Sequence, residues 1–231
     1  MMWIVWVVSL LSMAFAVWLM KDVLRRPTGT PKMQEISDLI RVGANAFMKR
    51  QYTTITVITL IFAVIIYFIY RYLGQASLGW STSLGFVFGA ACSTLAGIIG
   101  MWMSVRANVR VAAGAQKSMN DALIPALRGG AVSGIFIVSL SLLGIALLFS
   151  IFGMWHDVKE IPFLIVGYGF GASFVALFAQ LGGGIYTKAA DVGADIAGKV
   201  ICPLILSNPF AVPRLKFCNV EVEPCNIAIM Y

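Results

Sequence analysis

The sequence predicts an all-α integral membrane protein with about five transmembrane helices. Of its 231 residues, 60% are hydrophobic and only 12% are charged. The mean hydropathy is +0.89, which lies far outside the balance of a soluble domain. Five apolar segments are each long enough to cross a hydrocarbon core about 30 Å thick. Composition and segment length together exclude a soluble globular protein.

The five predicted spans follow one another along the chain. They cover residues 2–20, 53–70, 84–103, 131–152 and 161–181. The first span could instead be a secretory signal peptide, but it lacks a basic start and a small-residue cleavage site before Lys21. We therefore expect it to be retained as a membrane helix.

Basic residues predict the orientation of these spans. The two connections rich in basic residues carry Lys21, Arg25, Arg26, Lys32, Arg41, Lys49 and Arg50, then Arg106, Arg110, Lys117 and Arg128. The positive-inside rule makes these connections cytoplasmic, places the amino terminus outside, and ends the fifth span inside. This topology explains most of the net charge of +7, so we expect a lipid bilayer and no nucleic acid as partner.

The cytoplasmic stretch 32–50 predicts an amphipathic helix that leads into the second span. Its apolar and small residues recur at helical spacing, at Ile36, Leu39, Ile40, Gly43, Ala46 and Phe47. The simplest interpretation of its basic residues is a solvated face near anionic lipid headgroups.

Small residues are dense in the third and fifth spans, where they predict close packing of helix backbones. The glycine triplet 182–184 is different, because three consecutive glycines lower helix propensity by about 1 kcal/mol each. We expect another backbone or a ligand to lie close to this triplet.

Directly after the triplet, Lys188, Asp191 and Asp195 recur at i, i+3 and i+7, so they share one face of a helix. Two carboxylates four residues apart repel each other unless a cation lies between them. Mg²⁺ is the natural candidate, since it takes oxygen ligands and shares them with substrate phosphates. The alternative is an ordinary charged helix end, with Lys188 paired to Asp191 and Asp195 solvated.

Residues 182–200 read Gly-Gly-Gly-Ile-Tyr-Thr-Lys-Ala-Ala-Asp-Val-Gly-Ala-Asp-Ile-Ala-Gly-Lys-Val. This run resembles the substrate motif of the membrane-bound, ion-pumping inorganic pyrophosphatases. Residues 42–52 are similar to the first cytoplasmic segment of that family, with Val42 in place of a glutamate. Residues 106–110 and 128–132 are similar to its third-to-fourth connection.

The resemblance implies hydrolysis of pyrophosphate coupled to transport of H⁺ or Na⁺, with Mg²⁺ as cofactor and a homodimer as assembly. It implies that Lys188 contacts pyrophosphate and that Asp191 and Asp195 hold Mg²⁺. Gln180 stands where many members have a gate arginine. Catalytic residues stay unassigned, because the family holds its attacking water partly with acids from later helices. Whether K⁺ activates the hydrolysis is left open.

The resemblance covers residues 1–200, which we expect to form one helical membrane domain and an incomplete part of a larger many-span bundle. Residues 201–231 contain several prolines without helical periodicity, so we expect an irregular tail that matches nothing in the family. We expect the abrupt change at Val200 to reflect a frame slip or a premature stop.

Two functions follow as hypotheses. The first is the amino-terminal part of an ion-pumping pyrophosphatase, inactive by itself, in a multi-pass arrangement that we expect in the bacterial plasma membrane. The second is a non-catalytic membrane helix bundle or scaffold that binds Mg²⁺ or anions without turnover.

Overall fold

The computed structural model of the chain describes residues 2–154 and 161–206. Side chains are described for these residues except 2, 76–77, 194 and 197–206. Most of the predicted tail, residues 207–231, lies outside the described residues. Residues up to Ala179 form one compact unit, and the described residues from Gln180 onward belong to a second unit.

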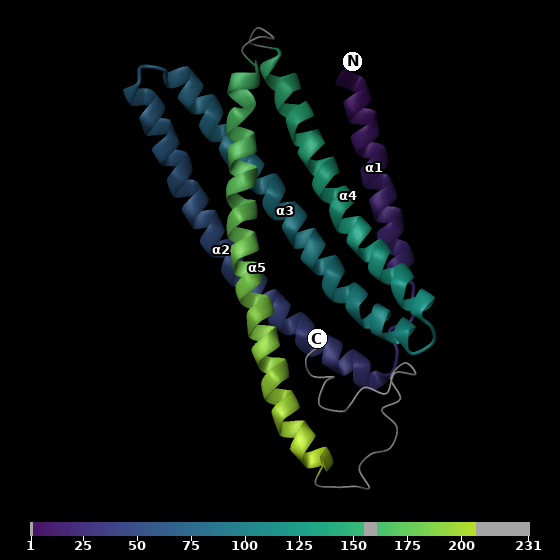
Figure 1. Cartoon of the computed structure of the whole chain (residues 1–231). Helices are drawn as coiled ribbons and strands as arrows, with labels where there is room; N and C mark the ends of the chain where they lie inside the picture. The colour runs from purple at the N-terminus through teal and green to yellow at the C-terminus, as the bar shows by residue number, and fades with distance from the viewer. Residues whose placement is uncertain (1, 155–160, 207–231) are drawn as a thin grey trace. The chain divides into compact units, whose positions relative to one another are not determined.

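The described residues form five α-helices, which confirms the predicted fold class (Figure 1). The helices are α1 (Met2–Leu24), α2 (Pro31–Tyr72), α3 (Ala76–Ala115), α4 (Met119–Phe152) and α5 (Ile161–Leu206). Each contains one predicted span, and each is long and apolar enough to cross a membrane. The chain is therefore a multi-pass membrane protein.

Helix α2 joins the predicted amphipathic stretch to the second span without a break over 42 residues. Thr30 caps its start, because its hydroxyl oxygen accepts a hydrogen bond from the Met33 amide at 3.4 Å. Pro31 follows at the first helical position, where a missing N–H has no cost. The prediction of a helix leading into this span is confirmed.

The connection between α3 and α4 is much shorter than the distribution of basic residues suggested. Arg106 and Arg110 lie within α3, and Arg128 lies within α4, so these residues extend from helices rather than from a loop. Ser118 caps α4, accepting a hydrogen bond from the Asp121 amide at 3.1 Å.

Helix α1 packs mainly against α4, and α3 packs against both α2 and α4. Ala16, Leu19 and Val23 of α1 are buried together with Met103 and Val132. At the end of this contact, Arg128 of α4 forms an ion pair with Asp22 of α1. Arg26 lies 3.6 Å from the same carboxylate.

Four glycines bring α3 and the first part of α5 into backbone contact. A Cβ at Gly89 would overlap the carbonyl oxygen of Tyr168. A Cβ at Gly171 would overlap the carbonyl oxygen of Phe86, and Gly85 and Gly167 lie in the same contact. Each pair is spaced by four residues, so both glycines lie on one helix face. The predicted packing role of these small residues is confirmed.

Large apolar side chains cover the outside of the described helices. Examples with more than half of their surface exposed are Trp3, Leu11, Leu60, Leu95, Val138, Phe163 and Phe170. Such surfaces suit lipid, which solvates apolar side chains as well as a protein interior does.

Helix α5 runs six residues past Val200 and ends at Leu206. The prolines of segment 201–231 predict an irregular tail, but the helix includes residues 201–206 of that segment. Residues 201 and 204–206 are isoleucine or leucine, which are acceptable helix formers.

The substitution Gly171→Ala tests the α3–α5 contact. The added methyl group meets the Phe86 carbonyl, so we expect a destabilisation of about 1–3 kcal/mol. Gly169→Ala is the matched control, because a Cβ at Gly169 meets no atom within 4 Å. The protein is heated in detergent and then run on a size-exclusion column. The measurement is the temperature at which the height of the monodisperse peak falls to half. Equal behaviour of both variants would contradict the contact.

Candidate functional site

Hydrogen bonds from two other helices fix the first part of α5. The Tyr168 hydroxyl donates to the carbonyls of Leu140 and Ser141 on α4, each at 3.3 Å. The Gln51 side-chain amide on α2 donates to the carbonyls of Phe178 at 2.9 Å and Ala179 at 3.3 Å. These bonds hold α5 just before the glycine triplet.

Aromatic contacts support the same part of α5. The ring of Phe174 lies 4.9 Å from that of Phe62 on α2, measured between centroids. It also lies 5.6 Å from the ring of Phe86 on α3. Phe174 therefore packs between side chains of two neighbouring helices.

The three predicted site residues lie on the continuous second half of α5. Lys188 Nζ is 3.9 Å from Asp191 Oδ2, with 78% and 59% of the two side chains exposed. An exposed ion pair at this distance contributes little, since water screens it. The lysine therefore stays available to a stronger anionic partner. Asp195 is exposed one turn further along.

The carboxylates of Asp191 and Asp195 are suited to provide part of the ligand shell of a Mg²⁺ ion. Asp191 and Asp195 are separated by four residues, which puts their Cβ atoms about 5–6 Å apart on one face. Within the described residues, no group of three or more acidic, histidine or cysteine side chains gathers. Mg²⁺ commonly takes one or two carboxylates and completes its shell with water and substrate phosphates. Two exposed carboxylates meet that requirement.

Gln180 lies on the same side of α5, about three helical turns before Asp191. Its side chain is exposed. An amide can donate and accept hydrogen bonds but carries no charge, so it cannot balance a carboxylate as an arginine would.

Two glycines of the triplet have open space beside them. A Cβ at Gly183 or Gly184 meets no atom within 4 Å, unlike the packed glycines of α3. Thr187 donates to the Gly184 carbonyl at 3.0 Å. No close backbone in the described residues explains these two glycines, and the expectation that a ligand or another segment approaches here stays a prediction.

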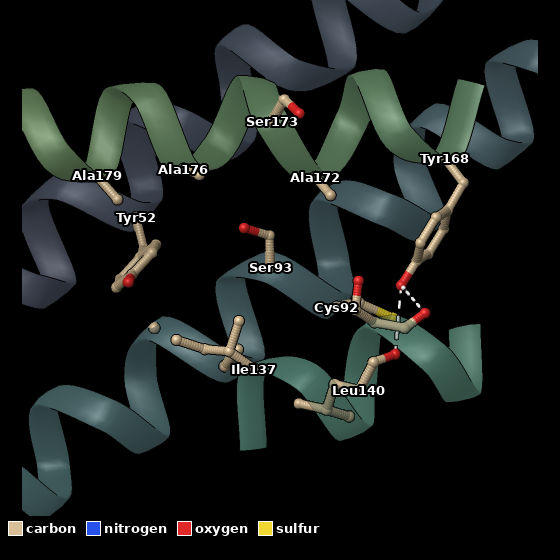
Figure 2. A pocket seen from close by; sticks show the side chains of 13 residues that line it. Tyr52, Cys92, Ser93, Ile137, Leu140, Tyr168, Ala172, Ser173, Ala176 and Ala179 are labelled. Atoms are coloured by element: carbon tan, nitrogen blue, oxygen red, sulfur yellow. Dashed lines mark hydrogen bonds between the residues drawn. The ribbon is translucent and has the colours of Figure 1, made fainter. Parts of the chain in front are cut away.

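A separate cavity of about 420 Å³ lies among α2, α3, α4 and the first part of α5 (Figure 2). Its polar lining consists of hydroxyl and thiol groups from Tyr52, Cys92, Ser93, Ser141, Tyr168 and Ser173. None of its lining residues is charged, so it cannot balance the charge of pyrophosphate. Figure 2 shows the Tyr168 hydroxyl bonded at one end of the cavity.

The sequence alone predicts no role for Gln51 or Tyr168. Gln51 stood inside the motif-like run 42–52, but its partners lie 127 and 128 residues away. A polar residue at the edge of an apolar span was the available signal, because such a group needs a hydrogen-bond partner.

The comparison with family models gives a match over most of the chain. The model of the inorganic H⁺ pyrophosphatase family matches residues 10–205. The chain belongs to this family. The match confirms the resemblance and extends five residues beyond the expected end at Val200.

Curated relatives agree with this membership. A pyrophosphate-energized membrane proton pump 3 of Arabidopsis thaliana is 47% identical over 215 residues, which cover 85% of the chain. A K⁺-insensitive pyrophosphate-energized proton pump of Caldanaerobacter subterraneus is 55% identical over 194 residues, covering 79%. A pump of the same description from Methanosarcina mazei is 45% identical over 192 residues, covering 83%. The chain spans 27% of the length of each of these relatives.

The substitution Gln51→Ala tests the anchor on α5. The carbonyls of Phe178 and Ala179 also accept the helical amides of Gly182 and Gly183. Loss of a hydrogen bond worth about 1 kcal/mol should raise hydrogen exchange at these amides about fivefold. Gln51→Glu should raise it further, because a carboxylate repels carbonyl oxygens.

Gln116→Ala, at an exposed position after α3, is the control and should leave exchange in α5 unchanged. Exchange measured by mass spectrometry on peptides that cover residues 178–186 gives the comparison. Identical hydrogen exchange in the wild type and in both Gln51 variants would show that Gln51 does not anchor α5.

Proposed function

We propose that this chain supplies part of the magnesium–pyrophosphate site of a proton-pumping pyrophosphatase. In this site Lys188 contacts the pyrophosphate, and Asp191 and Asp195 are ligands of Mg²⁺. One observation carries the proposal: a lysine and two aspartates share one exposed face of α5 in a chain of this family. The relatives named above are described as energized by pyrophosphate.

The chemistry of these side chains suits the substrate. A lysine ammonium is a compact charge with three donors, which suits phosphate oxygens. Mg²⁺, when bound, neutralises charge on the substrate and on the leaving phosphate. The aspartates orient the metal, and their exposure leaves them open to a soluble anion. The residues that activate the attacking water stay unassigned.

The transported ion in this proposal is H⁺ rather than Na⁺, since the relatives are described as proton pumps. Several relatives are described as K⁺-insensitive, and this supports a site that works without K⁺. Gln180 would then contribute hydrogen bonds, but no charge, to the gate.

The finer topology belongs to the same proposal. The basic connections support an amino terminus outside and Lys188, Asp191 and Asp195 on the cytoplasmic side. A homodimer and a bacterial plasma membrane stay predictions. The relatives named above come from a plant, a bacterium and an archaeon.

A chimaeric pump tests the role of the charged face. Residues 10–205 of this chain would replace the matching segment of the Caldanaerobacter relative. In this pump Lys188→Ala, Asp191→Asn and Asp195→Asn should each lower Mg²⁺-dependent pyrophosphate hydrolysis by about 10²-fold or more, because each removes charge stabilisation from the reacting phosphates. Proton uptake into membrane vesicles should fall in parallel.

Glu35→Gln is the matched control, because Glu35 is an exposed acid on α2, outside this face. It should leave both activities unchanged. An active chimaera that tolerates Lys188→Ala would refute the proposed substrate contact.

The chain alone should release no phosphate from magnesium pyrophosphate above the level of a Lys188→Ala variant. The reason is that Lys188, Asp191 and Asp195 are all used to hold the substrate and its metal, so none of these three is free to act as the base for the attacking water. The measurement is phosphate release by the purified chain in lipid nanodiscs. Hydrolysis that the Lys188 substitution abolishes would show that the chain is catalytically sufficient. This outcome would also exclude the non-catalytic scaffold.

A further inference from the structure

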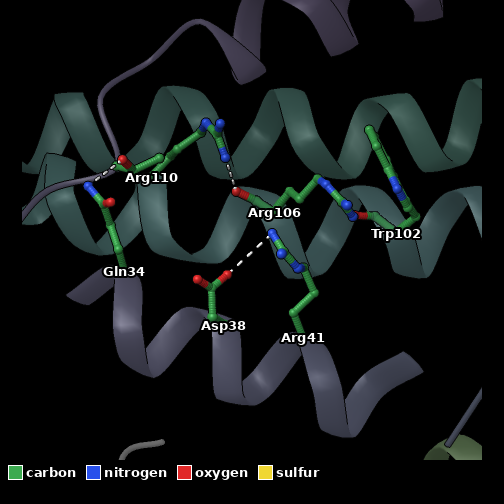
Figure 3. Close-up of polar contacts among 7 residues, drawn as sticks. Gln34, Asp38, Arg41, Trp102, Arg106 and Arg110 are labelled. Atoms are coloured by element: carbon green, nitrogen blue, oxygen red, sulfur yellow. Dashed lines mark hydrogen bonds and ion pairs between the residues drawn. The ribbon is translucent and has the colours of Figure 1, made fainter. Parts of the chain in front are cut away.

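Arginines from two helices converge where the first half of α2 passes the end of α3 (Figure 3). Arg41 comes from α2, and Arg106 and Arg110 come from α3. Arg41 Nη1 lies 3.3 Å from Asp38 Oδ1. Figure 3 shows the Arg41 guanidinium group between this carboxylate and the Arg106 side chain.

The positive charges of this cluster exceed its negative charge. Both Arg41 and Arg110 lie close enough to Arg106 to repel it. Among the described residues, Asp38 is the one acid that forms an ion pair within the cluster. Like charges held together raise the energy of the protein unless an anion offsets them.

The three arginines differ in how far their donors are already used. Arg110 Nη2 donates to the Leu24 carbonyl at the end of α1, at 3.0 Å, so this side chain ties two helices together. Arg106 Nη1 donates to the Trp102 carbonyl at 3.2 Å. A guanidinium has five donors, which leaves Arg106 and the half-exposed Arg41 with capacity for a further acceptor.

Trp102 indicates the depth of this cluster. The Arg106 guanidinium carbon lies 3.9 Å from the centroid of the Trp102 ring, a cation–π contact that holds the guanidinium plane in place. Trp102 stands at the end of the predicted span 84–103, and tryptophans concentrate at the level of lipid headgroups. With the predicted span 84–103 in the hydrocarbon core, we expect the cluster to lie at the level of the lipid phosphates.

We propose that Arg41 and Arg106 form a binding site for a phosphate group, with Trp102 orienting Arg106. Two planar guanidinium forks from different helices can each give paired hydrogen bonds to phosphate oxygens. The phosphate can belong to an anionic phospholipid or to a soluble phosphate. The site is separate from Lys188, Asp191 and Asp195 and does not rest on the pyrophosphatase proposal.

Native mass spectrometry of the full chain, purified with an equimolar mixture of phosphatidylglycerol and phosphatidylcholine, tests the lipid source. We expect the wild type to retain phosphatidylglycerol about tenfold more than phosphatidylcholine, and Arg41→Gln with Arg106→Gln to lose this preference. Lys32→Gln with Lys49→Gln is the matched control. It removes the same charge from exposed positions of the first half of α2 and should keep the preference.

Calorimetric titration of the chain in phosphatidylcholine nanodiscs with inorganic phosphate, at constant ionic strength, tests the soluble source. The glutamine pair is the variant Arg41→Gln with Arg106→Gln, and the control pair is Lys32→Gln with Lys49→Gln. Heat of binding that disappears in the glutamine pair but not in the control pair supports a site for a soluble phosphate. The proposal is overturned if neither experiment depends on Arg41 and Arg106. It is equally overturned if the control pair loses as much binding as the glutamine pair, since this result means a diffuse charge effect.

The lysine pair, Arg41→Lys with Arg106→Lys, keeps both positive charges. It therefore tests the site even if the glutamine pair fails to fold. We expect the lysine pair to lose about threefold or more of the preference, since lysine cannot make paired hydrogen bonds. Preference equal to the wild type in the lysine pair would overturn the proposed guanidinium geometry.

Discussion

The close approach of α3 and α5 is the constraint on which the arrangement of the first unit depends. Gly89 and Gly171 leave no room for even a methyl group between the two backbones. In a membrane, lipid tails solvate apolar side chains as well as protein does, so packing and hydrogen bonds must hold helices together. Here the packing comes from glycines, and hydrogen bonds from Tyr168 and Gln51 fix α5 at two further points. The first part of α5 thus meets three other helices.

The chemistry lies on the other half of the same helix. Before Ala179, α5 carries small and aromatic residues that contact neighbouring helices, and after it the helix exposes Lys188, Asp191 and Asp195. A single continuous helix therefore joins a tightly held apolar part to an exposed charged face. Between them lie Gly183 and Gly184, where an added Cβ would meet no atom within 4 Å.

Much of this could be predicted from the sequence because the signals are local. Apolar runs of about 20 residues fix the number of spans, and helical periodicity puts Lys188, Asp191 and Asp195 on one face. The anchor at Gln51 could not be predicted, because its partners are backbone carbonyls more than a hundred residues away and backbone groups leave no mark in the sequence. The same holds for the glycines of α3 and α5. Their high density is visible in the sequence, but the backbone atoms that they contact on the facing helix are not. The extension of α5 to Leu206 could not be predicted, because the prolines from Pro203 onward favour an earlier end of the helix.

The unbroken length of α2 has a mechanical consequence. At about 1.5 Å per residue its 42 residues extend for roughly 60 Å, about twice the thickness of the hydrocarbon core. Gln51 joins this rod near its midpoint to the backbone of α5. Because the hydrogen bonds of α2 run without a break from one end to the other, a tilt of one arm about Gln51 is passed on to the opposite arm. Displacement of α5 at Phe178 would in this way reach the far end of α2 with no intervening loop to absorb it.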